Sequence, residues 1–379
     1  MREESIEKIF EKVAEDLNIT DTQYETADSK YKELGKFLDK NTPDVKIDLY
    51  PQGSFALGTI IKPLDREDEY DLDFVCEYQA YDESAQALKA EVQSLLANYG
   101  KCEFTEKRRC WQVIYENCPQ FHMDIIPAVY KKEPREHIVI TNMKYDGHYE
   151  YIGSNPKAYI KWFKDKQKAS FQRLCENVRF QAKLQEIKEY KIKTTLQKAI
   201  QILKRHRDVM FKDDKNECKP ISIIITTMAA NMYNHEPRIF ETITNFLAGA
   251  EEYLRTCKND EGVYVIENPT FTGGETENFA DKWQIHPERE TAFFKWINKA
   301  KEDFNLEKIK AMSITELGQY LKIILGEKSG IRVFNSLAEE FKKDIENGKY
   351  KVDSKTGTIS EKGNVTIPTT HHYGKVSKN

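Results

Sequence analysis

The sequence lacks any apolar run long enough to cross a bilayer, and its first residues, MREESIEKIFEKV, are too charged for a secretory signal. It also lacks an excess of either charge, because 58 basic residues stand against 62 acidic ones and the net charge is only −4. Proteins that live on long duplex nucleic acid are usually basic, since neutralised phosphates supply much of their affinity. We therefore expect a cytoplasmic protein that needs neither a membrane nor nucleic acid.

The sequence also lacks a C-x-x-C pair, and its seven cysteines, an odd number, have irregular spacings. This pattern is typical of reduced thiols in a cytosolic protein. Cys102, Cys110, Cys118 and His122 are near enough in the chain for a zinc site to be considered. Without a C-x-x-C pair, separate packing and surface roles are the better interpretation.

The sequence does contain enough apolar material for a core, because hydrophobic residues make up 39% of its 379 residues. This length favours two domains. Residues 2–40 carry helical periodicity with a break at residues 18–21, and a long helix there could brace the two halves of the protein. A further helix is predicted over residues 84–99, ended by Gly100.

Residues 1–155 as a whole mix helix and strand patterns, whereas residues 156–350 are helical almost throughout, and Pro156 can occupy the first position of a helix. We therefore predict an α+β protein with a boundary near residue 155, followed in residues 351–379 by a polar, mobile tail.

An acidic pair stands inside a strand-like run at residues 70–75. Successive side chains of a strand point to opposite faces, so Asp71 and Asp73 share one face while Leu72 and Phe74 share the other. Two adjacent carboxylates repel each other and lose solvation. A divalent cation such as Mg²⁺ compensates for both effects, because it prefers oxygen ligands.

A third acid, Asp124, occupies a second strand-like run, in which Phe121, Met123 and Ile125 alternate with other residues until Pro127. We expect this strand to lie beside the first, with Asp124 facing the acidic pair. Three carboxylates on adjacent strands can hold two metal ions about 3.5–4 Å apart, a geometry that stabilises the attacking and leaving oxygens of phosphoryl or nucleotidyl transfer.

The turn PQGS, just ahead of these acids, is suited to binding a phosphate. Gly53 has no Cβ and lets the backbone approach a phosphate closely, while the hydroxyl and amide of Ser54 can donate hydrogen bonds to it. If a helix begins at Ser54, its N-terminus adds a favourable dipole.

Basic residues in two places leave alternatives open. Lys107, Arg108 and Arg109 precede the strand of Asp124, where one of them could contact a nucleotide or all could form a solvated turn. These two interpretations are about equally favoured by the sequence.

The second basic cluster lies in a helix predicted over residues 191–211. We expect Arg205 and Arg207 on a solvated face, whereas Lys204, at the edge of the apolar stripe, could reach inward to a triphosphate. Ser222, at the start of the apolar helix ISIIITTMAANM, could donate to a phosphate or cap its helix.

Taken in this order, these features resemble the bacterial CD-NTases, the cGAS/DncV-like nucleotidyltransferases of CBASS anti-phage defence, within the superfamily of DNA polymerase β. The matching segments extend over roughly residues 50–285 and comprise PQGSFALGTIIKP, EYDLDF, HMDIIP, SNPKAYIKWF, AIQILKRHRD and ENPTFTGGETENFADKW. The last two segments make the match more specific than the acids alone would.

The resemblance implies a polymerase-β-like nucleotidyltransferase core, a mixed β-sheet with flanking helices, joined to a C-terminal helical bundle with the active site in the cleft between them. It implies metal-binding and catalytic roles for Asp71, Asp73 and Asp124. It further implies nucleotide-binding roles for Gln52, Gly53, Ser54, Lys204 and Ser222.

By the same resemblance, the enzyme uses ATP or other nucleoside triphosphates and two Mg²⁺ ions, for which Mn²⁺ could substitute, to make a cyclic di- or trinucleotide and release pyrophosphate. An effector that senses the product is implied as a partner, as are ubiquitin-transfer-like enzymes that act on the C-terminus. The same acids would also serve a nucleotidyltransferase that makes a linear product or modifies an RNA or protein acceptor. A non-catalytic nucleotide-binding protein is a further alternative.

Overall fold

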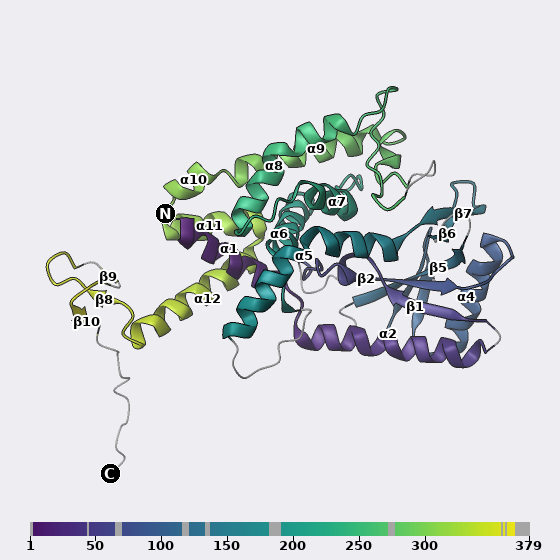
Figure 1. Cartoon of the computed structure of the whole chain (residues 1–379), viewed down its shortest axis with the longest axis horizontal. Helices are drawn as coiled ribbons and strands as arrows, with labels where there is room; N and C mark the ends of the chain where they lie inside the picture. The colour runs from purple at the N-terminus through teal and green to yellow at the C-terminus, as the bar shows by residue number, and fades with distance from the viewer. Residues whose placement is uncertain are drawn as a thin grey trace, which may run out of the picture.

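The structure is a computed structural model of the chain (Figure 1). It describes residues 3–43, 45–64, 70–115, 121–132, 137–181, 191–271, 277–357, 359–360 and 362–367. Three features of the sequence lie outside these residues: Cys118 among the zinc candidates, the Gly-Gly loop of the segment ENPTFTGGETENFADKW, and the last residues of the tail.

A seven-stranded mixed sheet forms the centre of the first part of the chain. Its strands are β1 (Ile47–Pro51), β2 (Tyr70–Tyr78), β3 (Glu103–Glu106), β4 (Trp111–Ile114), β5 (Phe121–Lys131), β6 (His137–Met143) and β7 (Tyr149–Ser154). Their order is β1-β2-β5-β4-β3, while the second half of β5 pairs with β6 and β6 pairs with β7. Only β2 and β5 run parallel in this described sheet. The two acid-bearing strands are therefore direct neighbours, as the sequence predicted.

Helices cover one face of the sheet and thereby decide which way the acids point. α2 (Asp21–Asn41) and α4 (Ala85–Tyr99) pack on it, and their apolar residues share one core with those of β2 and β5. Leu72 and Phe74 are fully buried in this core. Because side chains alternate along a strand, Asp71 and Asp73 face the opposite side, toward the helical part of the chain.

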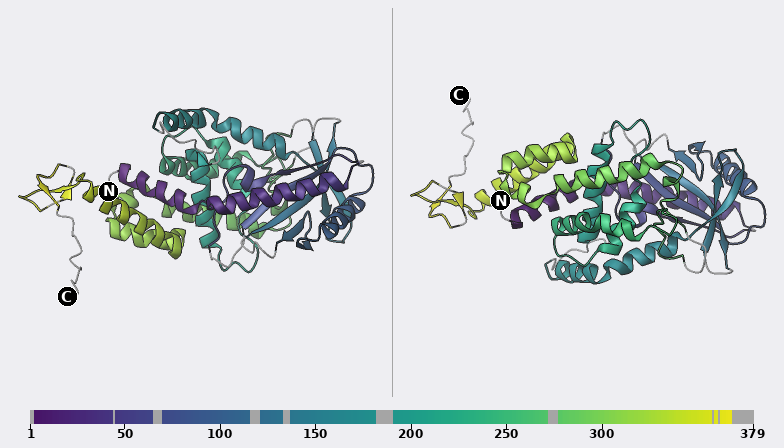
Figure 2. Two further views of the ribbon diagram at one scale, coloured as in Figure 1. Left: turned by 90° about the horizontal axis from the view of Figure 1, so that it is seen from below. Right: turned by 90° about the horizontal axis from the view of Figure 1, so that it is seen from above.

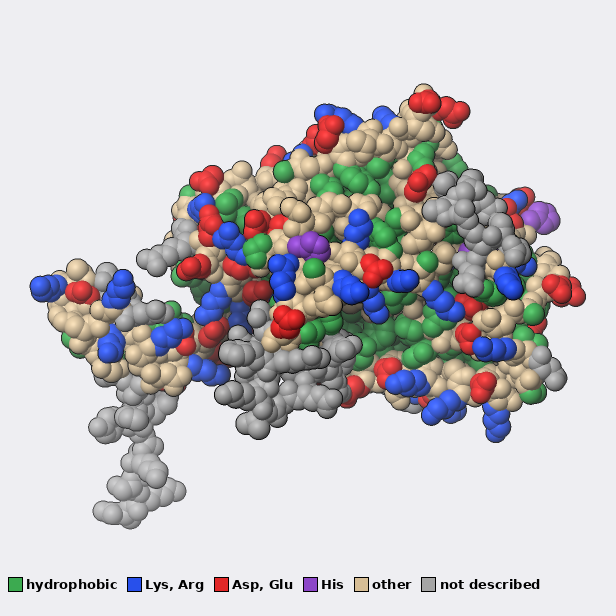
Figure 3. Space-filling view, in the orientation of Figure 1, with side chains coloured by type: hydrophobic (Ala, Val, Ile, Leu, Met, Phe, Trp, Pro, Cys, Tyr) green, Lys and Arg blue, Asp and Glu red, His purple; other side chains and the backbone are tan. Residues whose placement is uncertain are grey.

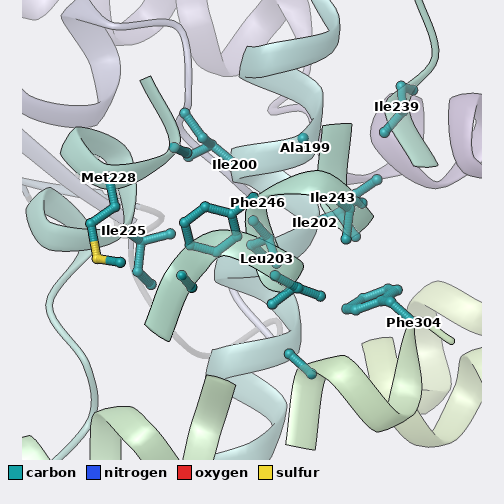
Figure 4. Packing of buried hydrophobic residues seen from close by; sticks show 14 of the residues in the cluster. Ala199, Ile200, Ile202, Leu203, Ile225, Met228, Ile239, Ile243, Phe246 and Phe304 are labelled. Atoms are coloured by element: carbon teal, nitrogen blue, oxygen red, sulfur yellow. The ribbon is translucent and has the colours of Figure 1, made fainter. Parts of the chain in front are cut away.

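The second part of the chain is a helical body that also includes the first helix. Its members are α1 (Glu3–Leu17), α5 (Pro156–Gln181), α6 (Thr195–Met210), α7 (Ser222–Met232), α8 (Ile239–Thr256), α9 (Pro287–Asp303), α10 (Leu306–Ala311), α11 (Ile314–Leu325) and α12 (Glu327–Glu346). α6 runs through the middle, where Ile200 and Leu203 pack with Ile225 of α7 and Phe246 of α8 (Figure 4). This core makes α6 a rigid wall facing the sheet.

The two arginine side chains of α6 are buried, so the prediction of a solvated arginine face is wrong. Arg205 is 2% exposed and Arg207 is 5% exposed. The guanidinium of Arg205 donates to the carbonyl oxygens of Lys62 and Pro63, and that of Arg207 donates to the carbonyl oxygen of Pro220. Irregular segments lie against this face of α6, and their carbonyl oxygens accept these hydrogen bonds. Helical periodicity cannot reveal such partners, because they come from distant parts of the chain.

The N-terminal helices connect the two parts of the molecule. α1 lies in the helical body and α2 lies along the sheet, so these two helices together extend over much of the long axis of the molecule (Figures 1 and 2). The expected brace is therefore two helices, with the first belonging to the core of the helical body. None of the helices in the described part of the chain is both long and apolar enough to span a bilayer.

The start of the tail carries regular structure. β8 (Lys351–Val352), β9 (Ile359–Ser360) and β10 (Val365–Thr366) form a small antiparallel sheet. It stands beyond the end of α12, away from the rest of the molecule (Figures 1 and 2). The mobility and the domain boundaries expected from the sequence stay predictions.

Candidate active site

Four polar side chains form a square on the face of β2 and β5 that looks toward the helical body. In the parallel register of these strands, Asp73 lies opposite Asp124 and Asp71 lies opposite His122. Residues two apart in a strand share a face, so three carboxylates and one imidazole are gathered there. The structure thus brings together the three acids singled out in the sequence.

Asp71 is the most accessible of the acids and is held by the imidazole. Nε2 of His122 lies 2.8 Å from Oδ1 of Asp71, and the two side chains are 12% and 70% exposed. The hydrogen bond from His122 lowers the pKa of Asp71, so this carboxyl is ionised at neutral pH. Sequence reasoning considered His122 only as a zinc ligand and missed this contact.

Asp73 lies directly beneath the Gly-Ser turn. The short helix α3 (Gly53–Ala56) begins one residue earlier than expected, at a glycine with φ of +59° that packs against the carboxylate of Asp73. The amide of Gln52 donates to the carbonyl oxygen of Asp73 over 2.8 Å, which fastens the turn to β2. Burial, reinforced by Asp124 and Asp71, raises the pKa of Asp73 to about 7.

Asp124 has one carboxylate oxygen that is both buried and without a partner in the described part of the chain. Its Oδ1 is buried and, among the described residues, has no hydrogen-bond partner. Burial raises the pKa of Asp124, and a hydrogen bond with the thiol of Cys110 partly offsets this. Cys110, a second zinc candidate, therefore lies beside a catalytic candidate, in a role that its spacing in the sequence did not reveal.

The acid group fits a divalent cation in its chemistry, although the side chains are not drawn together around one. In the described part of the chain, no three or more His, Cys, Asp and Glu side chains stand close enough to hold an ion as they are. Like charges separate when nothing lies between them. The raised pKa of Asp73 and the unpaired Oδ1 of Asp124 are penalties that a cation bound by carboxylate oxygens would remove.

A pocket of about 670 Å³ opens between Asp71 and Asp73 on one side and α6 on the other, and Asp124 is not among the described residues that line it. Its described lining contains Gly53, Ser54, Asp71, Asp73, Lys204, Arg207, Lys219 and Ser222. Of the residues proposed to bind nucleotide, only Gln52 is missing from this lining, and its backbone N–H donates to β2 instead.

Lys204 enters the pocket from α6. It is 6% exposed, and its ammonium donates to the carbonyl oxygen of Thr59 over 3.1 Å. Burial, followed by the charge of Arg207, lowers the pKa of Lys204 to about 8, while Asp73 and Asp71 act in the opposite direction. A buried ammonium without a full counter-charge is a favourable partner for a polyphosphate.

Ser222 does not cap its helix, because Ile221 is the N-cap residue of α7. Nη1 of Arg207 donates to Oγ of Ser222 over 2.7 Å, while Nε and Nη2 of the same guanidinium donate to Oδ1 of Asp208. The serine hydroxyl is thus oriented by an arginine and lines the pocket. The capping alternative is therefore wrong, because a helix capped by Ser222 would begin at Ile223, whereas α7 begins at Ser222 itself.

A second hollow, of about 970 Å³, continues from the first and shares Lys219 and Ile223 with it. Its described basic lining is Arg108, Arg109, Lys131, Lys219, Lys282 and Arg289, and its rings include Tyr151, Phe271 and Trp283. Arg108 and Arg109 are thus turned toward the cleft, which favours the functional alternative over a solvated turn.

One amide side chain makes three of the hydrogen bonds that hold the far wall of this hollow. Oδ1 of Asn278 accepts from the amides of Ile266 and Ala280, and its Nδ2 donates to the carbonyl oxygen of Tyr264. This pins the segment NFADKW against the helical body. The motif that made the resemblance specific therefore shapes a wall of the cleft.

A pair of parallel strands bearing three acids, beneath a glycine turn and facing a basic helix, defines a nucleotidyltransferase. Residues 5–167 match the family described as Second Messenger Oligonucleotide or Dinucleotide Synthetase domain. The chain is 31% identical over 358 residues to the c-di-GMP synthase of Roseivirga ehrenbergii, a match that covers 90% of each protein.

Two solved structures share the fold. The CD-NTase CdnG of Bradyrhizobium diazoefficiens, in complex with GTP, superposes with a TM-score of 0.71 at 19% identity, over 87% of this chain and 97% of that one. CdnC of E. coli MS115-1 with ATP gives a TM-score of 0.60 at 14% identity, over 84% and 97%. The chain belongs to the bacterial CD-NTase family. The predicted fold class, family and enzyme class are confirmed, and the roles of individual residues stay predictions.

Proposed function

We propose that this chain joins nucleoside triphosphates into a cyclic di- or trinucleotide second messenger, with release of pyrophosphate, in bacterial anti-phage (CBASS) signalling. The observation that carries the proposal is the register that sets Asp73 opposite Asp124 beneath Gly53 and at the edge of the pocket. The relative from Roseivirga ehrenbergii is a c-di-GMP synthase, so we choose GTP as the first substrate to test and cyclic di-GMP as the expected product.

Asp71, Asp73 and Asp124 would hold two Mg²⁺ ions, for which Mn²⁺ could substitute. When bound, these ions supply charge neutralisation to the phosphates and lower the pKa of the acceptor hydroxyl. The protein's own part is to present ionised carboxylates. Asp71 is already ionised at neutral pH, because its pKa is lowered. The pKa of Asp73 is raised to about 7, so the protonated fraction of Asp73 would lose its proton when an ion binds.

We assign the donor triphosphate to the smaller pocket. Gly53 allows the backbone to approach a phosphate, and Ser54 adds a hydroxyl donor from the same turn. Lys204 contributes charge from the opposite wall, and Ser222, oriented by Arg207, contributes a hydroxyl. Gln52 supports this cradle by fastening the turn to β2.

The acceptor nucleotide is assigned to the larger hollow. It is continuous with the donor pocket and combines Arg108 and Arg109 with rings such as Phe271. Arginines suit phosphates, and aromatic rings suit the faces of bases. Two nucleotides in adjoining hollows would bring the acceptor hydroxyl toward the donor phosphate, which is the main contribution of positioning to the rate.

The remaining expectations about partners and place are part of the same proposal. A downstream effector would sense the product, and ubiquitin-transfer-like enzymes could act on the C-terminus, whose last residues lie outside the described part of the chain. We place the enzyme in the cytoplasm. The face seen in Figure 3 carries basic and acidic side chains interspersed, which favours free nucleotides over a long RNA as acceptor on this face.

Purified protein incubated with labelled nucleoside triphosphates, Mg²⁺ or Mn²⁺, and then phosphatase tests the proposal. We expect a phosphatase-resistant product without any added acceptor, identified by mass spectrometry, and no pyrophosphate release from Asp71→Asn or Asp73→Asn. A product that phosphatase degrades completely would establish the linear alternative. Near-wild-type activity of either variant would overturn the assigned site.

A further inference from the structure

His122 completes the square of polar side chains, but nothing in the proposed chemistry uses it. It stands opposite Asp71 in the register that sets Asp124 opposite Asp73. On its other side, His122 is opposite Ile114 of β4. The backbone of His122 is thus fixed by a strand on each side, and its side chain is only 12% exposed. The imidazole ring therefore has little freedom to move.

Asp71, in contrast to His122, is not enclosed by the surrounding protein. Its side chain is 70% exposed, and Nε2 of His122, 2.8 Å from Oδ1, restrains it. An exposed carboxylate on a strand otherwise samples several rotamers, and ordering it when an ion binds costs conformational entropy. The fixed ring therefore restrains a side chain that the surrounding protein does not enclose.

The contact leaves one carboxylate oxygen to serve as a ligand. A neutral imidazole that carries its proton on Nε2 donates to Oδ1, and Oδ2 is then the oxygen that remains for a cation. Carboxylates that bind metal ions in proteins are themselves hydrogen-bonded by an outer layer of side chains, which orients them. A hydrogen bond that orients one carboxylate in advance helps ion binding most where the carboxylates are not already placed around the ion, and the described carboxylates here are not.

We propose that His122 is a positioning residue: its Nε2–H restrains Asp71 and prepares Oδ2 as a ligand of the divalent cation. The proposal rests on the proposed function, because it presupposes that the acids bind such a cation. It goes further by assigning a specific donor, a specific atom and a specific acid. It also predicts that the geometry of the donor, rather than its charge, matters.

Titration of the full-length protein with Mn²⁺, followed by electron paramagnetic resonance without nucleotide, measures the effect directly. We expect His122→Ala to weaken Mn²⁺ binding about 10- to 100-fold. Glutamine places its amide nitrogen where the imidazole has Nε2, so His122→Gln should restore most of the affinity. Asparagine places its nitrogen at the level of Nδ1, so His122→Asn should not. His148→Ala, at an exposed position, is the control and should bind Mn²⁺ normally.

Steady-state assays add a second measurement. In His122→Ala, the Mn²⁺ concentration for half-maximal rate should rise while kcat at saturating Mn²⁺ is largely kept, because the residue does not touch the substrate. Thermal unfolding in EDTA checks that each variant is folded. The Gln and Asn variants both lack the ring and differ only in reach, so equal affinities for these two would overturn the proposal in favour of a packing role.

Asp73→Asn separates this inference from the function on which it rests. If Asp73→Asn loses Mn²⁺ and His122→Ala binds it as the wild type does, the role of His122 is wrong while the metal site stands. If Asp73→Asn keeps full Mn²⁺ affinity, the metal site itself is wrong, and the role of His122 falls with it.

Discussion

A Cβ added to Gly53 would stand 2.2 Å from Oδ2 of Asp73. No side chain can be accommodated at that separation, so the turn and the acid can be adjacent only because residue 53 is a glycine. Its φ of +59° adds a second reason, since L-residues rarely adopt this conformation. The phosphate-binding turn and the acid-bearing strand are therefore a single unit.

Gly53→Ala should reduce activity about 100-fold or more, because the displaced turn or carboxylate leaves its working position. Gly147→Ala is a matched control: its φ is +85°, but nothing lies within 4 Å of an added Cβ. Both variants should lose about 1–2 kcal/mol of stability through the left-handed backbone. Only the first should lose pyrophosphate release, and equal activities would contradict the close approach.

Asp73 should make the metal-free protein less stable as the pH rises. Burial, reinforced by Asp124 and Asp71, raises the pKa of Asp73 to about 7, whereas in an unfolded chain this proton is released at about pH 4. Between these values the native state binds more protons than the unfolded state, so the free energy of unfolding falls with increasing pH. Asp73→Asn removes this effect. In EDTA, the Tm of Asp73→Asn minus the Tm of the wild type should increase as the pH is raised from about 4 to about 7. A difference that does not change with pH would contradict the raised pKa.

Lys204→Met should raise the KM for GTP about ten- to a hundred-fold, because a charge-assisted hydrogen bond to phosphate contributes about 1.5–3 kcal/mol. Burial lowers the pKa of Lys204 to about 8, so the charged form is disfavoured in the free enzyme. The Tm of the variant at pH 7 should therefore be kept or rise. Wild-type affinity for a non-hydrolysable GTP should fall as the pH rises through 8. Lys161→Met, at an exposed site on α5, is the control.

Ser54→Ala and Ser222→Ala should separate binding from stability. Loss of the Ser54 hydroxyl removes one donor from the turn while the backbone amides remain, so triphosphate affinity should fall about ten- to a hundred-fold at unchanged Tm. Loss of the Ser222 hydroxyl also leaves an N–H of Arg207 unpaired, which should cost about 1–3 kcal/mol of stability. Calorimetry of binding and of unfolding measures the two effects. Identical Tm values for the two variants would contradict the role of the Arg207 contact.

Local signals in the sequence predicted much of the fold. The break at residues 18–21 is confirmed by Thr20, which caps α2 with a reciprocal bond to Gln23. The helix ended by Gly100 is confirmed by a φ of +64° there. Such signals are reliable because a cap or a glycine stop satisfies backbone groups within a few residues of itself.

Contacts between distant segments were beyond such reasoning. Apolar periodicity identified α6 but could not show that Arg205 meets the carbonyls of Lys62 and Pro63, so its face was taken for a solvated one. α1 carries an apolar stripe that must face a core, but periodicity could not show that this core is that of the helical body. In both cases the partner lies far away in the chain.

The sequence by itself determined that Asp71, Asp73 and Asp124 stand on strand faces and that a glycine turn precedes them, because alternation along a strand is a local property. Only the tertiary structure decided that Asp73, rather than Asp71, lies opposite Asp124, that Gly53 touches Asp73 and that His122 holds Asp71. The physical reason is that strand order, register and the space around a side chain depend on how the whole chain packs.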